Sequence, residues 1–165
     1  MLATSVSDHI LLQMLNEKFD EIITLIDQLP EDLVNATPSL PGANSPVQIL
    51  VHCCGMMRRW SSSVNLGVPV ARDREGEFTA IMAKAEALSL AASTHQAFAK
   101  DLAKTDLHSS PVAIPPGREH EIWLATCLGV LLHVYEEFCQ HLGQLEITRD
   151  VLVFEQRTPG NQLGR

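Results

Sequence analysis

Four polar side chains recur along one face of the last helical stretch of the chain, namely His133, Glu137, His141 and Gln144. Residues four apart on a helix lie about 6 Å from each other on the same side, so Glu137 and His141 are placed to bind one metal ion together. Imidazole and carboxylate groups are common ligands of divalent transition metals. The same spacing also fits a solvated ion pair, which is the simpler interpretation.

A third ligand must come from another helix, and His52 is the best candidate. It interrupts an apolar run at residues 49–57, where a polar side chain needs a partner. Two histidines and one carboxylate suit zinc, with nickel or another divalent ion as alternatives. Three protein ligands leave a coordination position open, as catalytic sites do. Without a metal, His52 is an ordinary core histidine.

His133 lies one helical turn before Glu137 on the same face. At this position it could contact a metal ligand, contact a substrate, or act as a general base. An ordinary histidine at the edge of the core is the alternative. The spacing therefore makes His133 a candidate for the chemistry without making it a metal ligand.

Two other groups of residues near these positions have simpler interpretations. Arg72 and Arg74 could pair with carboxylates of a cofactor or substrate, but a solvated charge cluster is the simpler account. Cys53 and Cys54 follow His52 directly. Successive helical residues point about 100° apart, so these three side chains cannot converge on one ion. We expect both cysteines to be small core residues.

Helical periodicity runs through nearly the whole chain and supplies the elements that must position these residues. Apolar residues recur at intervals of three and four in four stretches, at about residues 8–29, 46–66, 78–107 and 121–152. Proline-bearing or charged segments separate the stretches at 35–46, 67–77 and 108–121. Ser7 and Ser45 are expected helix N-caps, and Gly67 is expected to end the second helix.

Four long helices with almost no strand pattern predict an all-α fold, an up-and-down four-helix bundle. The 165 residues suit a single domain over 1–165, with a polar tail from about residue 155. A net charge of -8 argues against nucleic acid and membrane surfaces as partners. With no signal-peptide or transmembrane pattern and no CxxC spacing, we expect a reduced, cytoplasmic protein.

The segment LLHVYEEFCQHLGQLEITRDVL (131–152), with its H-x3-E-x3-H-x-G-Q core, resembles the last helix of the DinB-like superfamily. More narrowly, it resembles the branch that contains mycothiol-dependent maleylpyruvate isomerase, which has Glu where many DinB-like proteins have His. Two further segments are similar to that family: ILVHCCGMMRRWSSSVNLG (49–67) to its second helix, and RDREGEF (72–78) to the stretch after it.

The resemblance implies a DinB-like bundle that holds a divalent metal through His52, Glu137 and His141. It also implies an enzyme that uses a low-molecular-weight thiol such as mycothiol. The metal-activated thiolate would attack a small electrophile, in a transferase or an isomerase reaction. The alternative is a non-catalytic bundle that binds a metal or ligand and acts as a dimeric interaction module. A homodimer is compatible with both functions.

Overall fold

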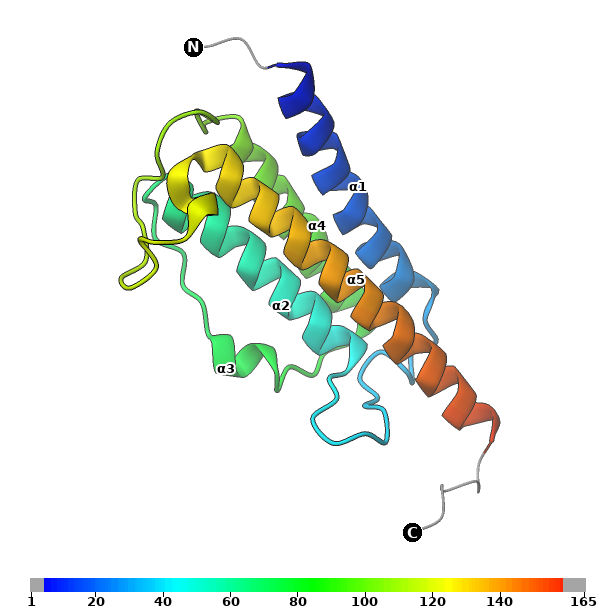
Figure 1. The fold of residues 1–165 in the computed structure, drawn as a ribbon. Helices are drawn as coiled ribbons and strands as arrows, with labels where there is room; N and C mark the ends of the chain where they lie inside the picture. Colours follow the sequence, from blue (N-terminus) through cyan, green and yellow to red (C-terminus); the bar gives the residue numbers. More distant parts are fainter. Residues whose placement is uncertain (1–4, 159–165) are drawn as a thin grey trace.

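The structure, a computed structural model, describes residues 5–158. Its helices, in chain order, are α1 (Val6–Gln28), α2 (Pro46–Arg58), η1 (Arg59–Asn65), α3 (Arg74–Glu77), α4 (Lys84–Leu102), η2 (Ile122–Ala125) and α5 (Cys127–Arg157) (Figure 1). Residues 5–158 contain no strand, so the expected all-α class is confirmed. No helix in this range is long and apolar enough to cross a membrane.

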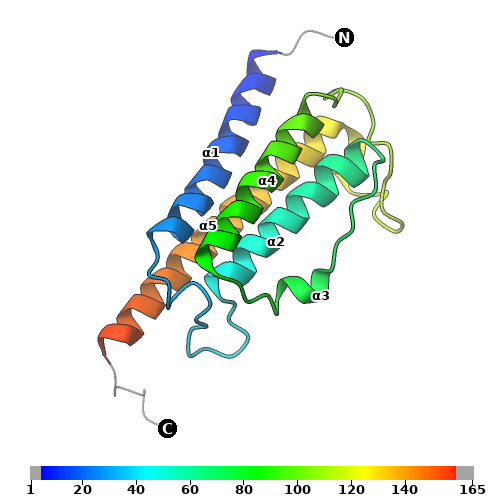
Figure 2. The same ribbon diagram turned by 180° about the vertical axis from the view of Figure 1, so that it is seen from behind.

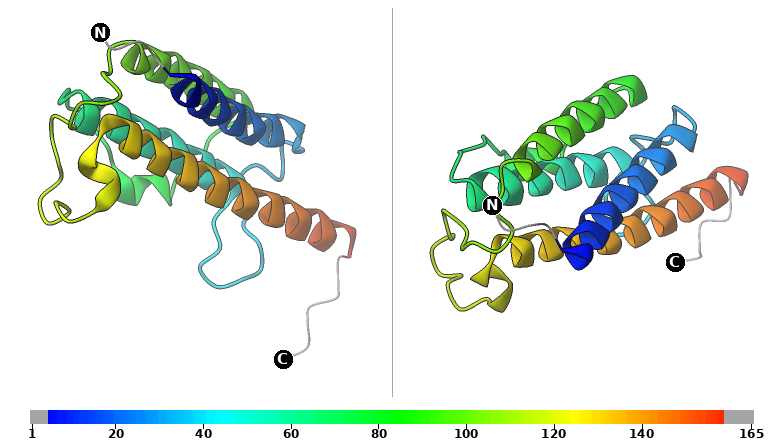
Figure 3. Two further views of the ribbon diagram at one scale, coloured as in Figure 1. Left: turned by 45° about the horizontal axis from the view of Figure 1, so that its top comes forward. Right: turned by 90° about the horizontal axis from the view of Figure 1, so that it is seen from above.

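The four long helices lie side by side, with α1 and α5 running one way and α2 and α4 the other (Figures 1 and 2). In a third view, α1 and α4 form one layer and α2 and α5 the other (Figure 3). Their directions therefore do not alternate as an up-and-down bundle requires. The reason is the long connection between α2 and α4, which returns along the molecule before α4 begins. The 19 residues of α4 rise about 28 Å, a distance that about ten extended residues span.

Two serines cap the first two long helices. The Ser5 hydroxyl accepts a hydrogen bond from the Asp8 amide, and the Asp8 carboxylate accepts one from the Ser5 amide. Ser7 is therefore not the N-cap, because the residue three positions after it is Ile10, which cannot complete this reciprocal pair. Ser45 caps α2 as expected, with Gln48 as its partner.

Several helix boundaries differ from the expected ones. The segment expected to be a surface connection contains α3, whose last residue, Glu77, is buried. The last long helix begins at Cys127 rather than near residue 121, because the Thr126 hydroxyl caps the Gly129 amide. It continues to Arg157, two residues past the start of the expected polar tail. Residues 159–165 of that tail lie outside the described range.

The end of the second helix is irregular. After Arg58 the backbone widens into the π-helical segment η1, which ends at Asn65. Gly67 follows with a φ of +66°, a left-handed conformation that favours glycine, so it ends this helical run as expected. π-helical turns are rare and are often found at functional sites.

The core fills the space between the four long helices. Phe19 of α1 and Phe138 of α5 stack at its centre, with their ring centroids 5.3 Å apart. On α2 the buried surface also includes a polar residue, His52, which is only 7% exposed. A buried imidazole needs hydrogen-bond partners, and these partners define the candidate site.

Candidate metal centre

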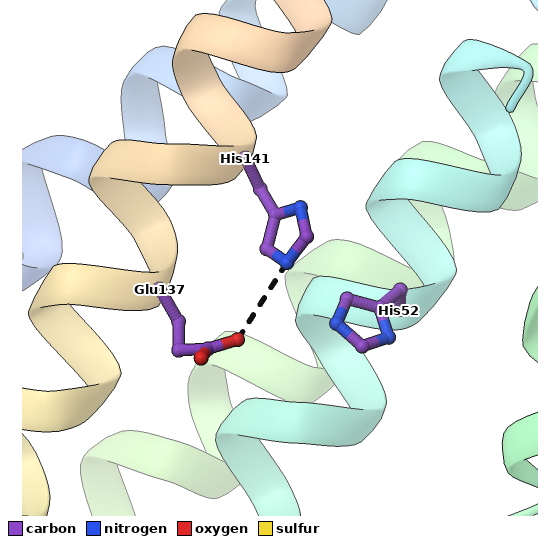
Figure 4. A group of neighbouring side chains, drawn as sticks. All are labelled: His52, Glu137 and His141. Atoms are coloured by element: carbon purple, nitrogen blue, oxygen red, sulfur yellow. Dashed lines mark ion pairs between the residues drawn. The ribbon is translucent and has the colours of Figure 1, made fainter. Parts of the chain in front are cut away.

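The structure brings together the three residues that were expected as metal ligands. His52 projects from the middle of α2, and Glu137 and His141 project from one face of α5 (Figure 4). One potential ligand atom from each residue lies within 4.8 Å of the other two. His141 Nε2 and Glu137 Oε2 lie 3.6 Å apart. We call these three residues the His–Glu–His cluster.

These separations fit a metal ion without rearrangement of the helices. Ligands at about 2.0–2.2 Å from a tetrahedral zinc ion lie roughly 3.3–3.6 Å from one another. The cluster is therefore slightly wider than a loaded site, by an amount that side-chain rotation can close. Its donors, two imidazoles and one carboxylate, are those that zinc and related divalent ions accept.

His52 is oriented by a buried acidic residue that sequence analysis did not identify. Its Nδ1 lies 2.9 Å from Oε2 of Glu77, a side chain that is 4% exposed. Arg72 in turn donates two hydrogen bonds to Glu77, at 2.5 and 2.8 Å. Arg72 is therefore not a solvated charge, as its simpler interpretation held, but part of a paired network behind His52. The only signal in the sequence was the need of a buried histidine for a partner.

His141 is oriented in the same way, by a residue of its own helix. Its Nδ1 lies 3.0 Å from Oε1 of Gln144. When Nδ1 carries the proton in this bond and in the bond to Glu77, the Nε2 lone pair of each ring is free to bind a metal. Metal-ligating histidines typically donate their other ring N–H to a carboxylate or carbonyl group. With both Nδ1 atoms bonded in this way, the three residues fit a bound divalent ion.

Gly55, nearly one turn after His52, allows the network to lie against α2. A Cβ atom at this position would overlap the Glu77 carboxylate and lie 3.2 Å from Arg72 Nε. Glycine is the one residue that leaves this surface of α2 free. The close packing of α3 on α2 therefore depends on Gly55.

The protonation states of Glu137 and His52 suit a metal, whereas a protonated His141 must release its proton to bind one. The contact with His141, 3.6 Å away, holds the pKa of Glu137 below its ordinary value, and the same contact raises the pKa of His141. Burial lowers the pKa of His52. Glu137 is therefore a carboxylate and His52 a neutral imidazole at neutral pH, which are the forms that bind metals.

His133 lies beside the cluster and is not part of it. Its Nε2 is 3.7 Å from Oε1 of Glu137, and its ring stacks on Trp123 with centroids 4.0 Å apart. Trp60 meets the same ring edge-on at 5.4 Å. His133 thus contacts one of the candidate ligands and is held by two aromatic walls.

Two of the four cysteines of the chain are poor sources of a thiolate. Cys53, Cys54 and Cys127 are buried, and Cys139 is half-buried. Burial raises the pKa of Cys54 to about 12 and that of Cys53 well above its ordinary value. Cys53 and Cys54 pack in the core, as expected. Neither Cys53 nor Cys54 is therefore a ready source of a thiolate at neutral pH.

Comparison with known proteins identifies the family. The family model described as mycothiol-S-transferase matches residues 10–153, a range that includes the whole His–Glu–His cluster. Neither the comparison with curated proteins nor that with solved structures found a match. The family indicates mycothiol-dependent transfer, with a thiol as partner. The match covers most of the sequence, and the chain belongs to the mycothiol-S-transferase family.

Proposed function

We propose that the protein is a metal-dependent enzyme that transfers mycothiol to a small electrophile, with His52, Glu137 and His141 as the metal ligands. The observation that best supports the proposal is the hydrogen bond that each of the two imidazoles makes through Nδ1. Each uses Nδ1 for a protein partner, at 2.9 and 3.0 Å, which leaves Nε2 for an ion beside the Glu137 carboxylate.

Zinc is the ion that this ligand set suits best, with nickel or another divalent metal as alternatives. A divalent ion with an open coordination position lowers the pKa of a thiol that binds to it, so that the thiolate is present at neutral pH. The protein contributes the orientation of the ligands through Glu77 and Gln144. Their hydrogen bonds fix which ring nitrogen of each histidine faces the site.

We assign to His133 the acceptance of the thiol proton. Its ring borders Glu137 without belonging to the His–Glu–His cluster, and an imidazole suits a general base near neutral pH. The thiol gives its proton to His133, and the sulfur forms a bond to the electrophilic carbon. The leaving group departs with the electron pair of its bond and takes up the proton.

The proposal is tested with zinc-loaded protein, mycothiol and an aryl halide electrophile, by mass spectrometry of the adduct. Wild-type protein should form the mycothiol adduct and consume the thiol stoichiometrically. His52→Ala should lose this activity and remain folded by circular dichroism. An isomerase would return the thiol unconsumed, and a structural metal would make His52→Ala unfold. Absence of adduct from metal-loaded, folded wild-type protein would contradict the proposal.

A further inference from the structure

A group of positive charges lies beside the His–Glu–His cluster, although the chain as a whole carries a net charge of -8. Four of its 12 basic residues, from three separate segments of the chain, contribute to this group: Arg59, Arg72, Arg74 and Arg118. Arg72 Nη2 lies 3.4 Å from His52 Nδ1, and Arg59 and Arg118 lie 5.5 and 5.1 Å from the centre of the Trp60 ring. The pKa of Arg59 is lowered, first by burial and then by the charges of the other three. Four guanidinium groups so close together repel one another, and an anion among them would relieve the repulsion.

Two of the four arginines already have carboxylate partners. Arg72 pairs with Glu77, and Arg118 pairs with Glu121 through two hydrogen bonds of 2.5 and 2.8 Å. Among residues 5–158, Arg59 and Arg74 form no ion pair. The group therefore has excess positive charge, and half-buried Arg59 is the cation that most needs a counter-ion.

Arg59 lies on the side of the His–Glu–His cluster where His133 is found. It follows His52 by seven residues, so it lies on nearly the same face of the helix, about 10 Å along the axis. α5 runs antiparallel to α2 (Figure 2). The direction from His52 to Arg59 along α2 is therefore the direction from Glu137 back to His133 along α5. The guanidinium group of Arg59 lies 5.5 Å from the centre of the Trp60 ring, and the same ring lies 5.4 Å from that of His133.

The rings of Trp60 and Trp123 lie beside these arginines. Arg118 lies over both tryptophan rings, 5.1 Å from the centre of Trp60 and 5.0 Å from that of Trp123. Gly129 lets Trp123 approach α5 so closely, because a Cβ there would overlap the Trp123 carbonyl. Cations held against aromatic faces are oriented and partly shielded from water, which strengthens their attraction for an anion.

We propose that Arg59, with Arg72 and Arg118 beside it, binds a carboxylate group of the electrophilic substrate. Guanidinium groups match the planar geometry of a carboxylate. The inference rests on the proposed function, since it places the anionic end of the electrophile here while the thiol occupies the metal. The preferred substrates are then small organic acids rather than neutral electrophiles.

Binding is tested first on metal-free protein without thiol, so that neither the metal nor catalysis contributes. Succinate and its uncharged diamide are titrated, and binding is followed by the fluorescence of the two tryptophans, which both border the site, and by the thermal midpoint. Succinate should bind at least tenfold more tightly than the diamide. Arg59→Gln should weaken succinate binding at least tenfold. Arg149→Gln, which removes a charge paired with Asp150 elsewhere on α5, should leave it within twofold.

The second arm measures transfer to iodoacetate and to iodoacetamide by zinc-loaded protein. Arg59→Gln should raise the KM for iodoacetate at least tenfold and leave that for iodoacetamide unchanged. Equal binding of succinate and the diamide, or equal effects of Arg59→Gln and Arg149→Gln, would overturn the carboxylate site. Selective succinate binding without any transfer would uphold the site and contradict only the proposed function.

Discussion

At the scale of single residues, the site depends on what lies behind each imidazole. Glu77 accepts from His52, and Gln144 accepts from His141. A carboxylate behind a histidine fixes the ring and makes it a stronger ligand than an amide does. His52 has the stronger acceptor and the more buried ring. Loss of its contact with Glu77 should therefore lower the metal affinity more than loss of the contact between His141 and Gln144.

We expect Glu77→Gln to weaken metal binding by about 10–100-fold, the usual effect of losing such a partner. The amide keeps the size of the side chain but loses the charge that pairs with Arg72. Competition with a chromophoric chelator measures the affinity. Glu75→Gln is the matched control, since Glu75 is an exposed carboxylate of the same short helix. Equal affinities of the two variants would show that Glu77 does not support the ligand.

Replacement of His133 by glutamine should separate proton transfer from metal binding. His133 borders Glu137 at 3.7 Å but is not a member of the His–Glu–His cluster. We expect the variant to bind metal like the wild type and to lose about 10²-fold or more in transfer rate, the typical contribution of a general base. Stopped-flow measurement at several pH values checks this, because a higher pH should recover part of the rate. Loss of the metal instead would make His133 a structural residue.

At the scale of elements, the packing of α3 on α2 is decided at Gly55. We expect Gly55→Ala to displace the Glu77 carboxylate, and therefore to weaken metal binding about as much as Glu77→Gln does. The helix itself would gain about 0.5–1 kcal/mol from the substitution, so any loss of stability measures the displaced contact. Urea unfolding and chelator competition test both effects.

Gly143 provides the control for that substitution. It also lies within a helix, but a Cβ there would have no neighbour within 4 Å. Gly143→Ala should therefore stabilise the protein by about 0.5–1 kcal/mol and leave the metal affinity unchanged. If Gly55→Ala behaved like Gly143→Ala, the close packing of α3 on α2 would not matter for the site.

The same elements show how far sequence reasoning extends. The period of apolar residues is a local property, so the four long helices and the face shared by Glu137 and His141 could be predicted. His52 could be selected because a buried polar residue is conspicuous in an apolar run. Glu77 could not, since its burial depends on how the long connection after α2 folds back to pack against Gly55. The parallel direction of α2 and α4 was missed for the same reason.

At the scale of the whole molecule, the cluster makes the stability of the metal-free protein depend on pH. The pKa of Glu137 lies below its ordinary value of 4.5 and that of His141 above its ordinary value of 6.5. The contribution of Glu137 to the free energy of unfolding is present above pH 4.5 and is lost as the pH falls through the lowered pKa. The His141 contribution is present below pH 6.5 and is lost as the pH rises through the raised pKa. Their interaction therefore stabilises the metal-free protein most at about pH 5–6.

We expect His141→Gln to destabilise metal-free protein more at pH 5.5 than at pH 8.5, because the charged imidazole that pairs with Glu137 is lost as the pH rises through the raised pKa of His141. Urea unfolding at the two pH values measures the difference. His9→Gln is the control, as an exposed histidine at the start of α1. An effect of His141→Gln that is independent of pH would contradict the ion pair with Glu137.

The most direct measurement of the central claim is the absorption spectrum of cobalt-substituted protein, before and after addition of mycothiol, alongside His52→Ala and His141→Ala. Wild-type protein should bind one cobalt ion per chain and give the visible bands of a four- or five-coordinate site. Mycothiol should then add a sulfur-to-cobalt charge-transfer band, and both variants should lack all of these features. A folded wild-type protein that binds no cobalt, or whose spectrum does not respond to the thiol, would contradict the account.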